Sequence, residues 1–350
     1  MISKIRLICP GVKSPLQNEM NESALSDYDY LEIDIADKLH PIINGKILIS
    51  VYVDSTGINI EMMRMLKKIS GFGQNFFEGS SAVLFVTGDS ELYTKSVARK
   101  IILYLNQAGV SFIGRPLVEA TGSMKNLTHI AISKNLTIQE TTLELSKELI
   151  NRLMQDSPPK KEIPELLVLY SSNWETSNTL MLWSRVKSLL HGVNIKEIHI
   201  ENGSVRDCIG CPYKTCKHYG QQERCYYGGI MVTEVYPAVL SCDALLLLCP
   251  NYNDSISANL SAVINRLTAL FRKTQFYDKY LFSIIVSGHS GSDLLAEQLI
   301  SALSINKTFR LPSGFTMMET ANDPGDVLKL DDIDLRINQF AENIKRTLIK

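Results

Sequence analysis

The clearest pattern in the chain is an alternation of apolar runs and helical periods that begins near residue 165. Runs with the length and composition of buried strands occur at 165–172, 193–200, 243–249 and 280–288. Stretches with apolar positions at helical spacing lie between and after them, at 177–190, 231–240, 258–271, 293–304 and from 335 onward. Strands that alternate with helices predict a doubly wound parallel sheet of the α/β class.

A boundary precedes this region. The stretch MQDSPPKKEIPE at 154–165 is rich in proline and lysine, and it follows an amphipathic run opened by the capping-box pattern Thr137-x-x-Glu140. A chain of 350 residues is long for one core and suits two domains. We therefore expect a first domain at 1–155, a linker at 156–164 and a second domain at 165–350.

The first half repeats part of the second. A shift of residues 48–119 by 200 positions needs no gap, and the matched residues gather at strand ends and in the loops that follow them. Among the pairs are Tyr52/Tyr252, Asp54/Asp254, Ser55/Ser255, Asn59/Asn259, Gly88/Gly288 and Glu119/Glu319. An internal duplication explains this better than chance does. After the first strand, however, the segment at 10–35 is polar and unpatterned, which predicts an N-terminal copy truncated at its first loop and helix.

The composition is that of an ordinary globular protein. The chain is 45% hydrophobic and 21% charged with a net charge of -1, so no basic excess points to nucleic acid. The most apolar run, at 244–250, is too short for a membrane helix, and the N-terminal apolar stretch is too interrupted for a signal peptide. We expect a cytoplasmic protein that keeps its thiols reduced and binds neither nucleic acid nor membrane.

Three polar loops follow predicted strands and fall on one edge of the predicted sheet. The first, LYSSNWETSNT at 169–179, ends in hydroxylated residues that open a helix, where backbone N–H groups favour an anion such as phosphate. The second, CPNYNDSISAN at 249–259, offers a tyrosine that can wall a flat ligand. The third, VSGHSGSD at 286–293, is glycine-rich. Each loop taken alone is also compatible with an ordinary helix cap.

The second half resembles the flavodoxin-like NADPH-dependent FMN reductases. The family's first loop, G-S-x-R-x-x-S-N-T, is similar to 171–179, although Ser171 replaces the first glycine. Its flavin-ring loop, S-P-x-Y-x-x-S-x-S-A, is similar to 249–258, although Asn253 replaces a common aromatic. The resemblance implies FMN as cofactor and NAD(P)H as co-substrate, in two tandem flavodoxin-like copies of which the first is degenerate.

The same resemblance implies the cofactor-binding residues. For the FMN phosphate they are Ser172, Ser177, Asn178 and Thr179. For the isoalloxazine ring they are Pro250, Asn251, Tyr252, Asn253, Ser257 and Gly288. No catalytic side chain is implied, because the cofactor carries the chemistry.

Four of the seven cysteines occupy a short segment between the second strand and the next helix. Cys208, Cys211, Cys216 and Cys225 follow the pattern C-x2-C-x4-C-x8-C. Thiolates are the ligands of iron–sulfur clusters, and zinc accepts the same ligands. The segment resembles the cysteine motif of iron–sulfur flavoproteins, although its gaps are longer. A [4Fe–4S] cluster, a zinc ion and metal-free thiols are the three alternatives. Cys9, Cys242 and Cys249 are expected to be core residues.

These observations predict an FMN-dependent NAD(P)H oxidoreductase that passes electrons to a small-molecule or protein acceptor, directly or through an iron–sulfur cluster. A non-enzymatic electron carrier and a ligand-free flavodoxin-like binding module are the alternatives. Family members place flavin at a subunit interface, so the first copy could serve as a tethered partner in an intrachain pseudo-dimer, and a homodimer is the other possibility.

Overall fold

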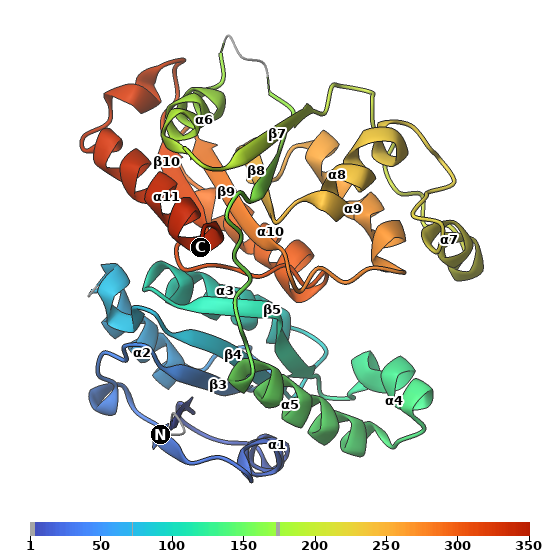
Figure 1. Ribbon diagram of the computed structural model, residues 1–350. Helices are drawn as coiled ribbons and strands as arrows, with labels where there is room; N and C mark the ends of the chain where they lie inside the picture. The colour runs from blue at the N-terminus through green and yellow to red at the C-terminus, as the bar shows by residue number, and fades with distance from the viewer. Residues whose placement is uncertain (1–3, 72, 173–175) are drawn as a thin grey trace. The chain divides into compact units, whose positions relative to one another are not determined.

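The structure, a computed structural model, describes residues 4–71, 73–172 and 176–350 (Figure 1). The predicted first loop therefore lies partly outside the described residues, since Asn173, Trp174 and Glu175 fall in the second gap. The chain divides into two compact units, Met1–Ser157 and Pro158–Lys350. In the described residues, no helix combines the length and the apolar character that crossing a membrane requires.

The first unit contains a five-stranded parallel sheet in the order β2-β1-β3-β4-β5. This is the strand order 2-1-3-4-5 of flavodoxin-like folds. The strands are β1 (Ile5–Ile8), β2 (Tyr30–Ile33), β3 (Lys46–Val53), β4 (Ser81–Gly88) and β5 (Ser111–Ala120). The helices are α1 (Pro15–Leu25), α2 (Ile60–Ser70), α3 (Thr94–Gln107), α4 (Thr128–Lys134) and α5 (Ile138–Met154).

The second unit has the same topology, with its sheet in the order β10-β9-β8-β6-β7. Its strands are β6 (Glu165–Tyr170), β7 (Asn194–His199), β8 (Ala244–Pro250), β9 (Tyr280–Ser287) and β10 (Thr316–Thr320). Its helices are α6 (Asn178–Leu189), α7 (Tyr213–Gly220), α8 (Tyr236–Ser241), α9 (Ala258–Phe271), α10 (Ser292–Leu299) and α11 (Ile333–Leu348). The prediction of two tandem doubly wound α/β copies is therefore confirmed.

The core of the second unit lies on both faces of its sheet. Helices α6 and α11 cover one face, while α8, α9 and α10 lie on the other (Figure 1). Trp183 of α6 is fully buried against Leu246 of β8 and Phe282 of β9, within one apolar cluster. Its indole N–H donates to Glu197 Oε1 at 2.6 Å, which satisfies the one polar atom of the side chain. This packing holds the start of α6 at a fixed height above the sheet.

The 200-residue repeat corresponds to equivalent elements. The shift carries β3 onto β8, α2 onto α9, β4 onto β9 and β5 onto β10, with starting residues that agree within a few positions. The matched residues that follow β3 and β8 therefore stand at the same place in both sheets, at the carboxyl ends of their third strands. The internal repeat found in the sequence therefore corresponds to a repeat of structural elements.

The prediction that the first copy lacks its first helix is wrong. Helix α1 is present and begins with a complete capping box, in which Ser14 and Gln17 bond reciprocally. Its inward face carries polar residues: the Gln17 amide donates to Cys9 Sγ at 3.3 Å and to Ser50 Oγ at 3.1 Å. Asn21 on the same face is also buried. Because these polar residues occupy core positions, the apolar period that signals a helix is missing from the sequence.

Candidate functional site

The three predicted loops meet at the carboxyl edge of the second sheet. The Oγ atoms of Ser171, after β6, and Ser257, after β8, lie 2.8 Å apart. The Asn251 amide, also after β8, donates to Ser287 Oγ at 3.0 Å and to the Ser290 carbonyl at 2.9 Å, both beyond or at the end of β9. Direct hydrogen bonds therefore join the loops into one rim, as the sequence predicted.

The first loop contains a buried hydroxyl without a partner. Ser172 is only 4% exposed, and its Oγ has no hydrogen-bond partner in the described part of the chain. Ser177 caps α6, because its Oγ accepts from the Leu180 N–H at 3.3 Å. A buried hydroxyl without a partner costs free energy unless a bound group satisfies it. Ser172 lies in the loop that leads into α6, and the start of a helix suits an anionic group.

Asn178 is engaged by the protein itself. Its side-chain amide donates to the carbonyl oxygens of Ala321 at 3.2 Å and Asp323 at 2.9 Å. Its Oδ1 accepts from the Gly325 N–H at 2.8 Å. The side chain thus ties the start of α6 to the segment after β10, and its donors are already used. Of the predicted phosphate ligands, Asn178 can offer a backbone N–H and not its amide, while the neighbouring Thr179 is also buried.

The second loop projects a tyrosine from a tight turn. Backbone bonds link Tyr252 and Ser255 in both directions, at 3.2 and 3.4 Å. The two central residues, Asn253 and Asp254, have φ values of 53° and 55°, in the left-handed region that asparagine and aspartate tolerate best. The turn leaves Tyr252 57% exposed, so one face of its ring is open to a ligand. Asn253, a predicted site residue, shapes the turn through its left-handed backbone conformation.

A glutamine from α10 holds the second loop in place. Gln298 donates from Nε2 to the Asp254 carbonyl at 3.1 Å, and its Oε1 accepts from the Ile256 N–H at 3.2 Å. No sequence pattern pointed to Gln298. Its signal is weak, because a single glutamine on an amphipathic helix resembles any partly exposed position.

Glycine allows the second and third loops to approach closely. Gly291 has φ 89°, and a Cβ at this position would overlap the Asp254 carboxylate and crowd the Asn251 amide. Gly288, the predicted site residue, lies near Asn322: a Cβ there would be 3.0 Å from the Asn322 side-chain oxygen. The sequence analysis singled out Gly288, but Gly291 is the glycine that the contact between loops requires.

The equivalent edge of the first unit is closed by its own side chains. The Ser14 N–H donates to Gln17 Oε1 at 3.3 Å, the Gln17 N–H donates to Ser14 Oγ at 3.1 Å, and Pro15 has no N–H. The Asn59 amide fills the space between loops by donating to the carbonyl oxygens of Pro10 and Tyr52. Few N–H groups at the start of α1 are therefore left for an anion, whereas α6 begins with neither a proline nor a capping box.

The cysteine segment packs against α9 without forming a ligand set. Cys208 is exposed and Cys211, Cys216 and Cys225 are partly exposed, all as free thiols. In the described ranges, no group of three or more potential metal-binding side chains is gathered. Burial raises the pKa of Tyr236, and the nearby thiols of Cys225, Cys216 and Cys208 raise it further. In that part of the chain the thiols do not converge on one point, and the structure does not support a [4Fe–4S] cluster.

The other three cysteines are core residues, as expected. Cys9, Cys242 and Cys249 are all buried. Burial raises the pKa of Cys249 and of Cys242 to about 12 and that of Cys9 to about 11, so all three remain protonated thiols near neutral pH.

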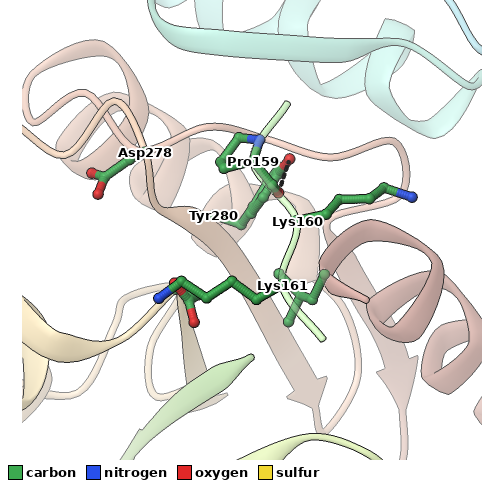
Figure 2. A pocket seen from close by; sticks show the side chains of 7 residues that line it. Pro159, Lys160, Lys161, Asp278 and Tyr280 are labelled. Carbon is green, nitrogen blue, oxygen red and sulfur yellow. Dashed lines mark hydrogen bonds and ion pairs between the residues drawn. The ribbon is translucent and has the colours of Figure 1, made fainter. Parts of the chain in front are cut away.

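A very small cavity lies at the end of the second sheet opposite the three loops (Figure 2). Its volume is about 10 Å³, which holds at most one water molecule. Lys161 Nζ forms an ion pair with Asp243 at 2.7 Å, and Tyr280 donates to the Pro159 carbonyl at 3.2 Å (Figure 2). These bonds fasten the start of the unit to its sheet, and the cavity is too small to bind a substrate.

The comparison with protein families agrees with the geometry. Residues 164–323 match the family model described as NADPH-dependent FMN reductase, which spans most of the second unit and less than half of the chain. The second unit is therefore an NAD(P)H-dependent FMN reductase-like enzyme domain. No curated protein matches the chain.

Several solved structures are similar to this chain at low identity. An NAD(P)H:quinone oxidoreductase from Methanothermobacter marburgensis is 15% identical, with a TM-score of 0.41, over 52% of this chain and 98% of that one. An NADH:FMN oxidoreductase in its apo form is 16% identical, with a TM-score of 0.36, over 53% and 90%. An azoreductase from Bacillus anthracis is 14% identical, with a TM-score of 0.37, over 53% and 99%. These values are too low to bear on the activity of this chain.

Proposed function

We propose that the protein is an FMN-dependent NAD(P)H oxidoreductase that passes electrons to a quinone or another small-molecule acceptor. The observation that carries the proposal is the convergence of three loops, after β6, β8 and β9, at one edge of the second sheet. Ligands of open α/β sheets bind at this edge, beside the point where the strand order reverses. In the second unit that point lies between β6 and β8.

The first loop is assigned the FMN phosphate. The Ser172 hydroxyl, which has no partner among the described residues, donates to a phosphate oxygen, together with the backbone N–H groups at the start of α6. Ser177, Asn178 and Thr179 form that first turn. The Asn178 side chain acts as a positioning group, since it fixes the turn to the segment at 321–325.

The second and third loops are assigned the isoalloxazine ring. Tyr252 offers an open ring face, and Pro250 and Ser257 flank it on the same loop. Asn251 has a buried Oδ1 without a partner in the described residues, which can accept a hydrogen bond from the ring edge. Gly288 lies in the third loop, at the point where this loop approaches the ring. When bound, FMN accepts a hydride from NAD(P)H and passes the electrons on, while these residues orient its ring and exclude water from it.

The decisive experiment is titration of the full chain with FMN, followed by steady-state NADPH and NADH oxidation with a soluble quinone. We expect one FMN per chain, because the helix start in the first unit is closed by Ser14, Pro15 and Gln17. We also expect turnover that depends on FMN. A chain that binds FMN without turnover would be an electron carrier, and a chain that takes up no FMN would contradict the proposal.

An iron–sulfur cluster on Cys208, Cys211, Cys216 and Cys225 is a separate hypothesis. The grouping of the four thiols on one segment favours it, whereas among the described residues their side chains form no ready ligand set. No electron-transfer step is assigned to it. Iron and sulfide analysis after anaerobic purification tests it, and a [4Fe–4S] cluster requires about four of each per chain.

A further inference from the structure

The first unit has an apolar groove between α2 and α3 that the proposed function does not use. Its volume is about 320 Å³, within the range of small-molecule sites. Its walls are formed by Ile58, Met62, Met63, Leu66, Val97 and Ile101. We call this feature the α2–α3 groove. The floor is rigid because Met62, Leu66 and Ile101 are buried, whereas Ile58 and Met63 on the rim are half exposed or more.

The equivalent face of the second unit is covered by the chain itself. There, α9 bonds to the long segment between β7 and α8: the Asn265 amide donates to Asp207 at 3.0 Å, and Arg266 donates to the Gly228 carbonyl at 2.8 Å. In the first unit the connection between β2 and β3 is shorter. It bonds to α2 through Glu61, which accepts from the Ala36 N–H at 2.7 Å, and Lys68, which donates to the Ala36 carbonyl at 2.8 Å. Neither residue lines the α2–α3 groove, so this connection leaves the groove open.

Two polar side chains of the groove lie on α3, and a third, that of Asn59 at the start of α2, is already bonded to backbone groups. Ser96 and Lys100 are one helical turn apart on α3, and both side chains are exposed. Neither side chain has a hydrogen-bond or ion-pair partner among the residues that the structure describes. The other exposed lysines of this pair of helices, Lys67 and Lys95, lie outside the groove. A cation without a partner at one end of an apolar channel is complementary to a molecule with an apolar body and an acidic head.

A tyrosine closes one end of the groove. Tyr93 precedes α3 with φ 76°, a strained conformation for an aromatic residue. Gly57 gives it room, because a Cβ at that position would overlap the Tyr93 ring. The two residues together place an aromatic wall against the apolar channel.

We propose that the α2–α3 groove binds a small amphipathic carboxylate, with the alkyl or aromatic body against Met62 and Met63 and the carboxylate at Lys100 and Ser96. This site is independent of the flavin site, since it lies in the first unit and shares no residue with the second.

Methyl NMR of the full chain tests the proposal, with [methyl-¹³C]methionine labelling and octanoate as the probe. Met62→Leu and Met63→Leu assign the two groove signals. We expect octanoate to shift both signals and to leave those of Met181 and Met317, in the second unit, unchanged. Groove signals that stay in place up to the solubility of octanoate would overturn the proposal.

Charge variants test the assignment of the head group. Lys100→Gln is expected to weaken octanoate binding about fivefold, the effect of one partly exposed ion pair, and to leave octan-1-ol binding unchanged. Lys67→Gln is the matched control and should alter neither. Equal effects of the two variants on octanoate would refute the role of Lys100.

A groove-filling variant distinguishes binding of octanoate from binding of a second copy of the chain. Ser96→Trp should abolish the octanoate response, while an unchanged signal of Met20, in the core of the first unit, shows that this unit is still folded. If sedimentation velocity shows a dimer that Ser96→Trp converts to monomer, a second copy of the chain occupies the groove and the proposal is wrong.

Discussion

The unpaired hydroxyl of Ser172 makes opposite predictions for the free and the FMN-bound protein. In the free protein, Ser172→Ala removes a buried polar atom that has no partner among the described residues. The variant should therefore be as stable as the wild type or more stable, by up to about 1 kcal/mol. In the complex, it removes a hydrogen bond to a charged group, which is worth about 1.5–3 kcal/mol. The dissociation constant for FMN should rise about 10-fold to about 150-fold.

Two measurements separate these effects. Urea denaturation of the flavin-free protein gives the free energy of unfolding, and quenching of flavin fluorescence gives the affinity. Riboflavin, which lacks the phosphate, should bind Ser172→Ala and the wild type equally. Ser188→Ala, at an exposed position on α6, is the control and should change neither quantity. A destabilised free protein with unaltered FMN affinity would show that Ser172 is an ordinary structural residue.

Three further substitutions test other parts of the rim. Asn178→Ala loses three hydrogen bonds to the segment at 321–325 and should lower the free energy of unfolding in urea by about 2–4 kcal/mol. Gly291→Ala should destabilise the chain by at least about 2 kcal/mol more than Gly325→Ala in thermal unfolding, since both glycines have positive φ but only Gly291 has a neighbour in the way; equal losses would refute the contact argument. Tyr252→Ala should weaken FMN and riboflavin alike, by about 10-fold in fluorescence titration, whereas Tyr52→Ala at the matched position of the first unit should have no effect.

The architecture could be predicted because its signals are local. The apolar run at 244–249 is buried along its whole length in β8, and the loops after the strands carried the expected polar residues. Parallel topology then places those loops on one edge, so their convergence followed from the alternation of strands and helices. The first helix was missed for a local reason as well, since Gln17 and Asn21 are polar residues at core positions.

The internal bonds of the site could not be predicted. Asn178 and Gly325 are 147 positions apart in the chain, and nothing at either position indicates the other. The same holds for Gly291, whose requirement comes from the Asp254 carboxylate in a different loop. The four clustered cysteines gave a strong pattern, but spacing alone does not say whether thiols converge on one point.

The bonds of Asn178 have a consequence for the C-terminal part of the molecule. Because one amide fastens residues 321–325 to the turn assigned to the phosphate, loosening that turn also frees the stretch that leads into α11. Protection of the last thirty or so residues from a protease should thus report whether the cofactor is in place, and digestion of this tail becomes a simple gauge of occupancy.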